Sequence, residues 1–175
     1  MKEVFPGLHV GNQTDYEQHV RIHEHDAIES WAYVLAAKEP WHRQAIGYTG
    51  RACDKAHPEY LMTFRRNKLI LNLVDAPKAE FFDKRIIDAA LDFIDEQLQQ
   101  RHMSVLIVCN QGESRSPSIA MLYIVSRGIP SIGNNCRASD SLEQCEAEFM
   151  KVYPEYNPGD GIRGFMKEHW SEYVG

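Results

Sequence analysis

The chain has 175 residues, of which 43% are hydrophobic and 25% charged, and it carries a formal net charge of -6. These values are ordinary for one soluble globular domain with a substantial core. The acidic balance argues against general nucleic-acid binding. No apolar run approaches the roughly 20 residues that span a bilayer, and the first residues lack the apolar region of a secretory signal.

The cysteines point to an intracellular protein. Cys53, Cys109, Cys136 and Cys145 form no CxxC pair, and the chain is not a small secreted scaffold. We therefore expect reduced thiols and a cytoplasmic location. Oxidised Cys109 would have Cys136 or Cys145 as a candidate disulfide partner. We expect no membrane association and no cofactor, and the sequence leaves the oligomeric state open.

The hydrophobic pattern predicts strands that alternate with helices. In chain order we expect a strand pair at 4–10, a weak polar helix at 15–30, strands at 31–37 and 68–74, a helix at 80–100, a strand at 104–108, and helices at 115–127, 139–152 and 161–173. Residues 104–108 (SVLIV) are continuously apolar, as in a strand buried on both faces. The expected fold is a single α/β domain with a mostly parallel sheet of about four to five strands, flanked by helices on both faces.

The loop after residues 104–108 carries the most informative motif. A loop between a buried strand and a helix presents free backbone N–H groups and the positive end of the helix dipole to an anion. Cys109 opens this loop, where the same field favours a thiolate. Gly112 lets the chain curl, Arg115 offers two donors to a phosphoryl group, and Ser116 can donate a hydroxyl to the sulfur.

Cys109 is either a buried structural residue or a nucleophile. Free cysteine is common as a small buried residue at the end of a strand. With glycine at about 7% of residues, a chance match at the other motif positions is on the order of one in a thousand per cysteine. We therefore interpret Cys109 as a nucleophile inside a phosphate-binding loop.

Cleavage of a phosphate ester by a thiolate needs an acid to protonate the leaving oxygen. Asp75 is the best candidate, because it follows a predicted strand at the sheet edge where the Cys109 loop also lies. An aspartate before Ala76-Pro77 is also a frequent turn former. Glu80 and Asp83 are weaker candidates, because acids near a helix start favour the helix dipole.

The pattern Cys109-x5-Arg115-Ser116 resembles the signature of the cysteine-dependent protein tyrosine phosphatase superfamily, especially the dual-specificity phosphatase-like branch. Residues 5–12 (FPGLHVGN), 71–75 (LNLVD) and 154–158 (PEYNP) also look like parts of that branch. The resemblance covers most of the chain except about 13–30 and 38–67.

This resemblance implies a metal-independent phosphatase that works through a cysteinyl-phosphate. Cys109 would be the nucleophile, Arg115 the phosphate clamp, Asp75 the general acid and Ser116 a donor that helps the thiolate leave. The phosphate-binding loop would comprise Asn110, Gln111, Gly112, Glu113, Ser114 and Arg115. Two positions depart from the family pattern: Val108 replaces a histidine, and Glu113 adds a negative charge that we expect at the rim.

Residues 38–68 form a long basic and aromatic excursion, with seven basic side chains against three acidic ones. It is either a wall that recruits a phosphorylated substrate, with Arg65 and Arg66 as candidate contacts, or a solvated excursion anchored by its aromatic residues. His19, His23 and His25 lack a further ligand at a recognisable spacing, as do Cys53 and His57. We therefore favour a polar surface helix over a metal site for the histidines.

The leading functional prediction is hydrolysis of phosphotyrosine in proteins, with phosphoserine and phosphothreonine as further substrates. A first alternative applies the same chemistry to a nucleotide, an RNA 5′-phosphate or a phosphoinositide. Residues 110–114 carry no lysine, which favours a protein or a small phosphate ester. A second alternative is a phosphate-binding pseudophosphatase, which Val108 keeps open and which the intact Cys109, Arg115 and Asp75 oppose.

Overall fold

The computed structural model describes residues 1–23, 30–128 and 140–174. Their strands form one sheet in the order β1-β2-β6-β3-β5-β4. The strands are β1 (Lys2–Phe5), β2 (Leu8–Gly11), β3 (Trp31–Leu35), β4 (Met62–Arg65), β5 (Lys68–Leu71) and β6 (Ser104–Val108). The four inner strands are parallel, and β1 and β4 run antiparallel at the two edges.

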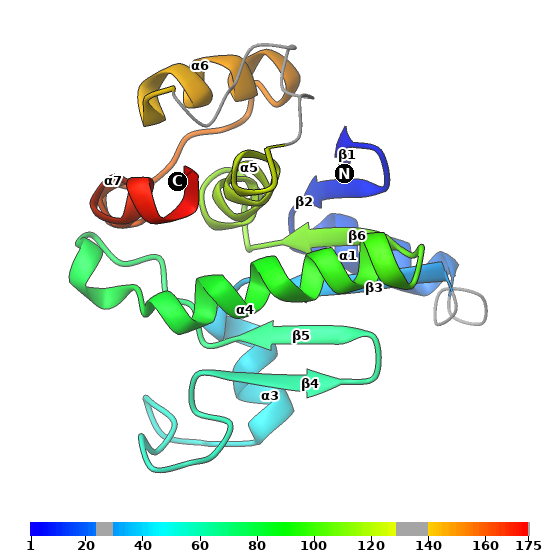
Figure 1. Ribbon diagram of the computed structural model, residues 1–175. Coiled ribbons are helices and arrows are strands. Elements are labelled where there is room, and N and C mark those ends of the chain that lie inside the picture. Colours follow the sequence, from blue (N-terminus) through cyan, green and yellow to red (C-terminus); the bar gives the residue numbers. More distant parts are fainter. Residues whose placement is uncertain (24–29, 129–139, 175) are drawn as a thin grey trace.

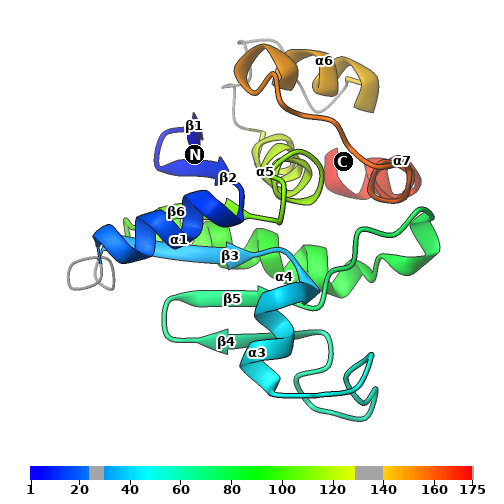
Figure 2. The same ribbon diagram turned by 180° about the vertical axis from the view of Figure 1, so that it is seen from behind.

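Helices cover both faces of this sheet. On one face lie α4 (Lys84–Asp95) and α5 (Arg115–Ser126), with α6 (Leu142–Val152) and α7 (Asp160–Val174) packed beyond α5 (Figure 1). On the other face lie α1 (Gln13–Ile22) and α3 (Arg43–Ile46) (Figure 2). Short helical segments are η1 (Lys38–His42), η2 (Ala79–Phe81) and η3 (Glu96–Gln100). The predicted α/β class with a mostly parallel sheet is confirmed.

The two faces have separate hydrophobic cores, which explains the continuously apolar strands. In β6, Val105 and Ile107 enter the large core under α4 and α5, whereas Leu106 and Val108 enter a smaller core under α1 and η1. Cys109, two residues after Ile107, also lies in the large core. The period-2 alternation of a strand therefore directs the side chain of Cys109 toward α5 and that of Val108 to the opposite face.

Two elements differ from the sequence prediction. The described residues form six strands, because β4 lies within the 38–67 excursion, where it pairs antiparallel with β5. Its sequence, MTFR, has two exposed residues on an edge strand and so gave no strand signal. The helix expected at 80–100 begins only at Lys84, because Asp83 adopts an extended backbone and its carboxylate accepts the N–H of Arg85 as an N-cap.

The expectation of reduced thiols is wrong for one cysteine, and some other expected features fall outside the described residues. Cys145 is part of a disulfide, whereas Cys53 and Cys109 are free; the absence of a CxxC spacing gave no sign of this bond. Cys136, His25 and the end of the helix expected at 15–30 lie outside the described residues. Among the helices that the structure describes, none is both long and apolar enough for a membrane span.

Candidate active site

The loop between β6 and α5 curls around the sulfur of Cys109. The backbone N–H of Gly112 donates to Cys109 Sγ over 3.3 Å, and Ser116 Oγ lies 3.2 Å from the same sulfur. Gly112 has a φ of +78°, and a Cβ there would lie 3.0 Å from the carbonyl oxygen of Gly11. Glycine is therefore required at this position, both by the backbone conformation and by the close approach of the neighbouring strand.

Ser116 links the sulfur to the end of β2. Its hydroxyl donates to the carbonyl oxygen of Gly11 over 3.2 Å, and the side chain is fully buried. Because a hydroxyl carries a single hydrogen, it cannot donate to Gly11 and to a thiolate at once. The serine can thus switch its donor between the carbonyl oxygen and the sulfur as the charge on Cys109 changes.

Arg115 begins α5, and its guanidinium is fixed by two other elements. Nη1 donates to the carbonyl oxygen of Leu73 over 3.0 Å, and Nη2 donates to Asn110 Oδ1 over 2.9 Å. Nε is buried and, within the part of the chain that the structure describes, has no hydrogen-bond partner. A buried guanidinium donor without an acceptor costs free energy, so this group favours the binding of an anion beside Cys109.

Asp75 lies in the segment that follows β5, beside the same loop. Its Oδ2 lies 3.8 Å from Arg115 Nε, and its Oδ1 accepts the Ser114 hydroxyl over 3.5 Å. Ser114 Oγ in turn accepts the N–H of Gly159 over 3.0 Å. The structure thus brings Asp75, Arg115 and Cys109 to one edge of the sheet, as parallel strands imply, and leaves the carboxylate exposed.

The other predicted loop residues divide into two groups. Gln111 and Glu113 are exposed, so Glu113 lies at the rim as expected. Asn110 fixes the loop, because its Nδ2 donates to the carbonyl oxygen of Glu39 over 2.9 Å while its Oδ1 holds Arg115. Asn110 therefore positions the guanidinium rather than pointing freely toward a ligand.

Three residues outside the loop hold it in place, and of these only Asn157 lies in a stretch that the sequence singled out, residues 154–158. Tyr153 donates its hydroxyl to the carbonyl oxygen of Gly112 over 2.9 Å, and the N–H of Asn157 donates to the carbonyl oxygen of Glu113 over 2.8 Å. Gly159 contacts Ser114 as described above. Burial raises the pKa of the Tyr153 phenol, so this hydroxyl stays a donor. The PEYNPG turn was the only sequence signal for this contact.

Val108 does not contact a ligand position. Its side chain is fully buried in the small core, together with Tyr33, Leu35 and Trp41. Because Cys109 faces the other side of the sheet, Val108 contributes to the packing beneath the loop and lies on the opposite face from the sulfur.

α1 is a polar surface helix that buries two side chains, and one of them is His19. His19 is buried, its Nδ1 lies 3.2 Å from the Tyr33 hydroxyl, and its ring packs against Trp31 and His23. The expectation of a surface helix is therefore wrong for this residue, because α1 is amphipathic and places Tyr16 and His19 toward the sheet. Among the residues described, no cluster of three or more potential ligands exists for a metal ion.

The basic residues of the 38–68 excursion do not all lie near the Cys109 loop. Arg65 and Arg66 lie at the turn between β4 and β5, at the opposite end of the sheet from the Cys109 loop. Arg65 forms an ion pair with Glu59. Lys38 lies close to the loop, because its N–H donates to the carbonyl oxygen of Leu73 that also holds Arg115. Recruitment of a substrate by Arg65 and Arg66 is thus not supported by their position.

No model of a known protein family matches the chain. Solved structures do resemble it along nearly its whole length. A human tyrosine phosphatase-like serine/threonine/tyrosine-interacting protein has 21% identity and a TM-score of 0.61, covering 100% of this chain and 98% of its own. Human DUSP28 has 13% identity and a TM-score of 0.62, with 99% and 94% covered. The Yvh1 phosphatase domain of Chaetomium thermophilum has 16% identity and a TM-score of 0.59, with 95% and 91% covered. The chain therefore has the fold of the dual-specificity branch of the protein tyrosine phosphatases.

Proposed function

We propose that the protein is a metal-independent phosphomonoesterase that hydrolyses phosphotyrosine in proteins, and phosphoserine or phosphothreonine as further substrates. The observation that carries the proposal is the Nε of Arg115, which is buried in the loop that curls around Cys109, has no hydrogen-bond partner among the described residues, and lies 3.8 Å from the Asp75 carboxylate. A nucleophile, an anion clamp and an acid thus share one site.

In the first step, the Cys109 thiolate attacks the phosphorus of the bound monoester. A sulfur–phosphorus bond forms as the bond from phosphorus to the ester oxygen breaks. Arg115 and the N–H groups of the loop hold the nonbridging oxygens. The carboxyl group of Asp75 gives its proton to the departing oxygen, which leaves as an alcohol or phenol.

In the second step, Asp75 is a carboxylate and accepts a proton from water. The water oxygen attacks the phosphorus of the cysteinyl-phosphate, and the sulfur–phosphorus bond breaks to release inorganic phosphate and a thiolate. Ser116 lies 3.2 Å from the sulfur, where its hydroxyl can turn from the Gly11 carbonyl oxygen to stabilise the thiolate.

Hydrolysis of p-nitrophenyl phosphate and of a phosphotyrosine peptide, both with a chelator present, tests this proposal. We expect the wild type to be active, Cys109→Ser to be inactive, and Asp75→Ala to lose about 100-fold or more in kcat on the peptide, as for a lost general acid. Glu80→Ala is the matched control, because Glu80 is the neighbouring carboxylate that the sequence left as a weaker acid candidate. Its kcat should stay at the wild-type value, even where the change alters KM for the peptide.

The alternatives give different results in the same experiment. An inactive wild type that still binds the phosphopeptide would favour a pseudophosphatase. Activity on nucleotides, RNA 5′-phosphates or phosphoinositides far above that on the peptide would favour a non-protein substrate. If Glu80→Ala loses activity while Asp75→Ala keeps it, the general acid is Glu80.

A further inference from the structure

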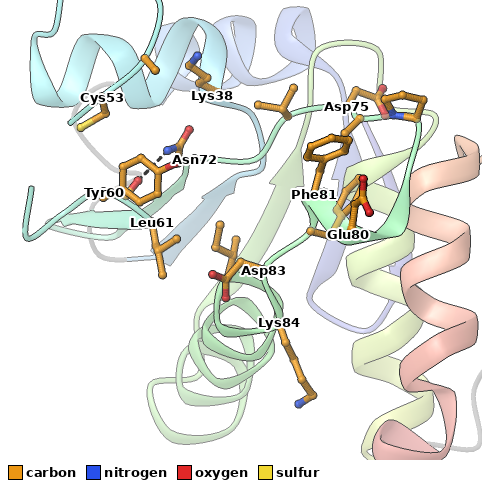
Figure 3. Close-up of a pocket in the computed structure, with 16 residues that line it drawn as sticks. Lys38, Cys53, Tyr60, Leu61, Asn72, Asp75, Glu80, Phe81, Asp83 and Lys84 are labelled. Carbon is orange, nitrogen blue, oxygen red and sulfur yellow. Dashed lines mark hydrogen bonds between the residues drawn. The ribbon is translucent and has the colours of Figure 1, made fainter. Parts of the chain in front are cut away.

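A second concave site adjoins the catalytic loop. A cavity of about 780 Å³ is lined by the excursion at Tyr60 and Leu61, by the segment after β5 at Val74 and Asp75, and by Phe81. Neither Cys109 nor Arg115 lines it, so Asp75 is the group that the catalytic site and this cavity share. Figure 3 shows Tyr60 and Leu61 on one side of the cavity and Asp75 and Phe81 on the other.

Two apolar side chains that line the cavity are unusually exposed to solvent. Phe81 is 63% exposed and Val74 is 52% exposed, although most side chains of this size are buried in the described residues. Both border the same hollow as the proposed general acid. A cluster of exposed apolar groups rimmed by polar residues marks a surface that binds a ligand or partner.

The polar groups of the cavity disfavour a second phosphate. The ammonium of Lys38 already donates to the carbonyl oxygen of Arg51 over 2.6 Å, and that of Lys84 pairs with Asp88 over 2.8 Å. The lining also contains three carboxylates, those of Asp75, Glu80 and Asp83. An additional anion would therefore meet repulsion here, whereas an apolar group would meet Val74, Phe81 and Leu61.

The excursion holds its side of the cavity in a fixed shape. Arg43 pairs with Glu39 over 2.7 Å and donates to the carbonyl oxygens of Tyr48 and Gly50. Asn72 ties the wall to the segment that carries Asp75, because its Nδ2 donates to the carbonyl oxygen of Tyr60 over 2.7 Å. A preformed wall loses little conformational freedom when a ligand binds.

We propose, on the basis of the proposed phosphatase function, that this cavity binds a large apolar side chain next to the phosphorylated residue of a protein substrate. Asp75 must contact the leaving oxygen, so the rest of the substrate extends from the Asp75 side into the cavity. The volume lies in the range of whole small-molecule sites, roughly 300–1,000 Å³, and exceeds what the ring of a phosphotyrosine fills. A polypeptide supplies the additional group from its neighbouring residue. The cavity thus selects apolar over acidic residues beside the phosphorylation site.

Phosphotyrosine peptides that differ only in the flanking residue test this selection. We expect the wild type to hydrolyse a leucine- or phenylalanine-flanked peptide with a kcat/KM about tenfold above that of the alanine-flanked peptide, and a glutamate-flanked peptide more slowly still. Phe81→Ser and Leu61→Ser should reduce the preference for leucine over alanine toward one. Phe64→Ser is the matched control, because Phe64 is 56% exposed on the edge strand β4, outside the cavity, and it should keep the full preference.

Equal kcat/KM values for all flanking residues, or a preference for glutamate, would overturn the inference. The inference would also be overturned if Phe81→Ser and Leu61→Ser slowed the hydrolysis of bulky aryl phosphates but not of peptides. The occupant of the cavity would then be a small ester. Hydrolysis of p-nitrophenyl phosphate separates this result from failure of the proposed function. If the wild type is inactive on it, binding of the same peptides to Cys109→Ser reports the selection directly.

Discussion

At the scale of single residues, the role proposed for Ser116 predicts an effect on one step of the reaction. Its hydroxyl lies 3.2 Å from Cys109 Sγ and equally far from the Gly11 carbonyl oxygen. We expect Ser116→Ala to form the cysteinyl-phosphate at a near-normal rate but to hydrolyse it about 10- to 100-fold more slowly, the effect of losing a hydrogen bond to a charged group. Rapid-mixing kinetics should then show a burst of phenol release. Ser126→Ala, at the far end of the same helix, should show no burst; a linear time course for Ser116→Ala would contradict this role.

The residues of the Cys109 loop were predictable because their chemistry depends on spacing within eight positions of the chain. Their supports were not. The carbonyl oxygens of Gly11 and Leu73 hold Ser116 and Arg115 through backbone atoms, whose role no side-chain pattern announces. The assignment of Asp75 depended on its place after a predicted strand and on the resemblance of residues 71–75, and the structure places it beside Arg115. Its role as the acid stays a prediction.

At the scale of elements, the turn between α6 and α7 holds the Cys109 loop in shape. Tyr153 supplies the hydroxyl bond to Gly112, and we expect Tyr153→Phe to lower the free energy of unfolding by about 1 kcal/mol. It should also weaken binding of a phosphate analogue, because Gly112 then loses its external anchor. Tyr156→Phe is the control, since the Tyr156 hydroxyl bonds to Glu146 instead of the loop. Thermal unfolding should place both variants close together, and titration with vanadate should separate them. If the two variants bind vanadate with equal affinity, the Tyr153 contact does not affect phosphate binding.

Elements were predictable from the sequence where one physical signal dominates. β3 and β6 are continuously apolar because both of their faces are buried. The prediction failed where two signals compete. Phe82 continues the apolar spacing of α4, but Asp83 caps the helix later, and this leaves the preceding Phe81 in the wall of the cavity. β4 was missed because an edge strand needs only one buried residue, Thr63, to pair with β5.

At the scale of the whole molecule, buried and half-buried histidines make the stability of the fold depend on pH. Burial lowers the pKa of His9, His19 and His42 from the ordinary value of 6.5. The folded state then binds fewer protons than the unfolded state between those lowered pKa values and 6.5, so unfolding takes up protons in this window. The free energy of unfolding should be highest above pH 6.5 and should fall as the pH drops from about 7 toward 5.

Denaturant unfolding of the wild type and of His19→Phe across this pH range measures the effect. His19 lies against Trp31 and Tyr33 in the small core, and nearby His23 and His9 lower its pKa further. The variant should therefore show a shallower loss of stability on acidification. Unfolding at pH 8, where the three histidines are neutral in both states, isolates any change in packing. If the two proteins lose stability in parallel below pH 6.5, the titration of His19 does not contribute to the acid sensitivity.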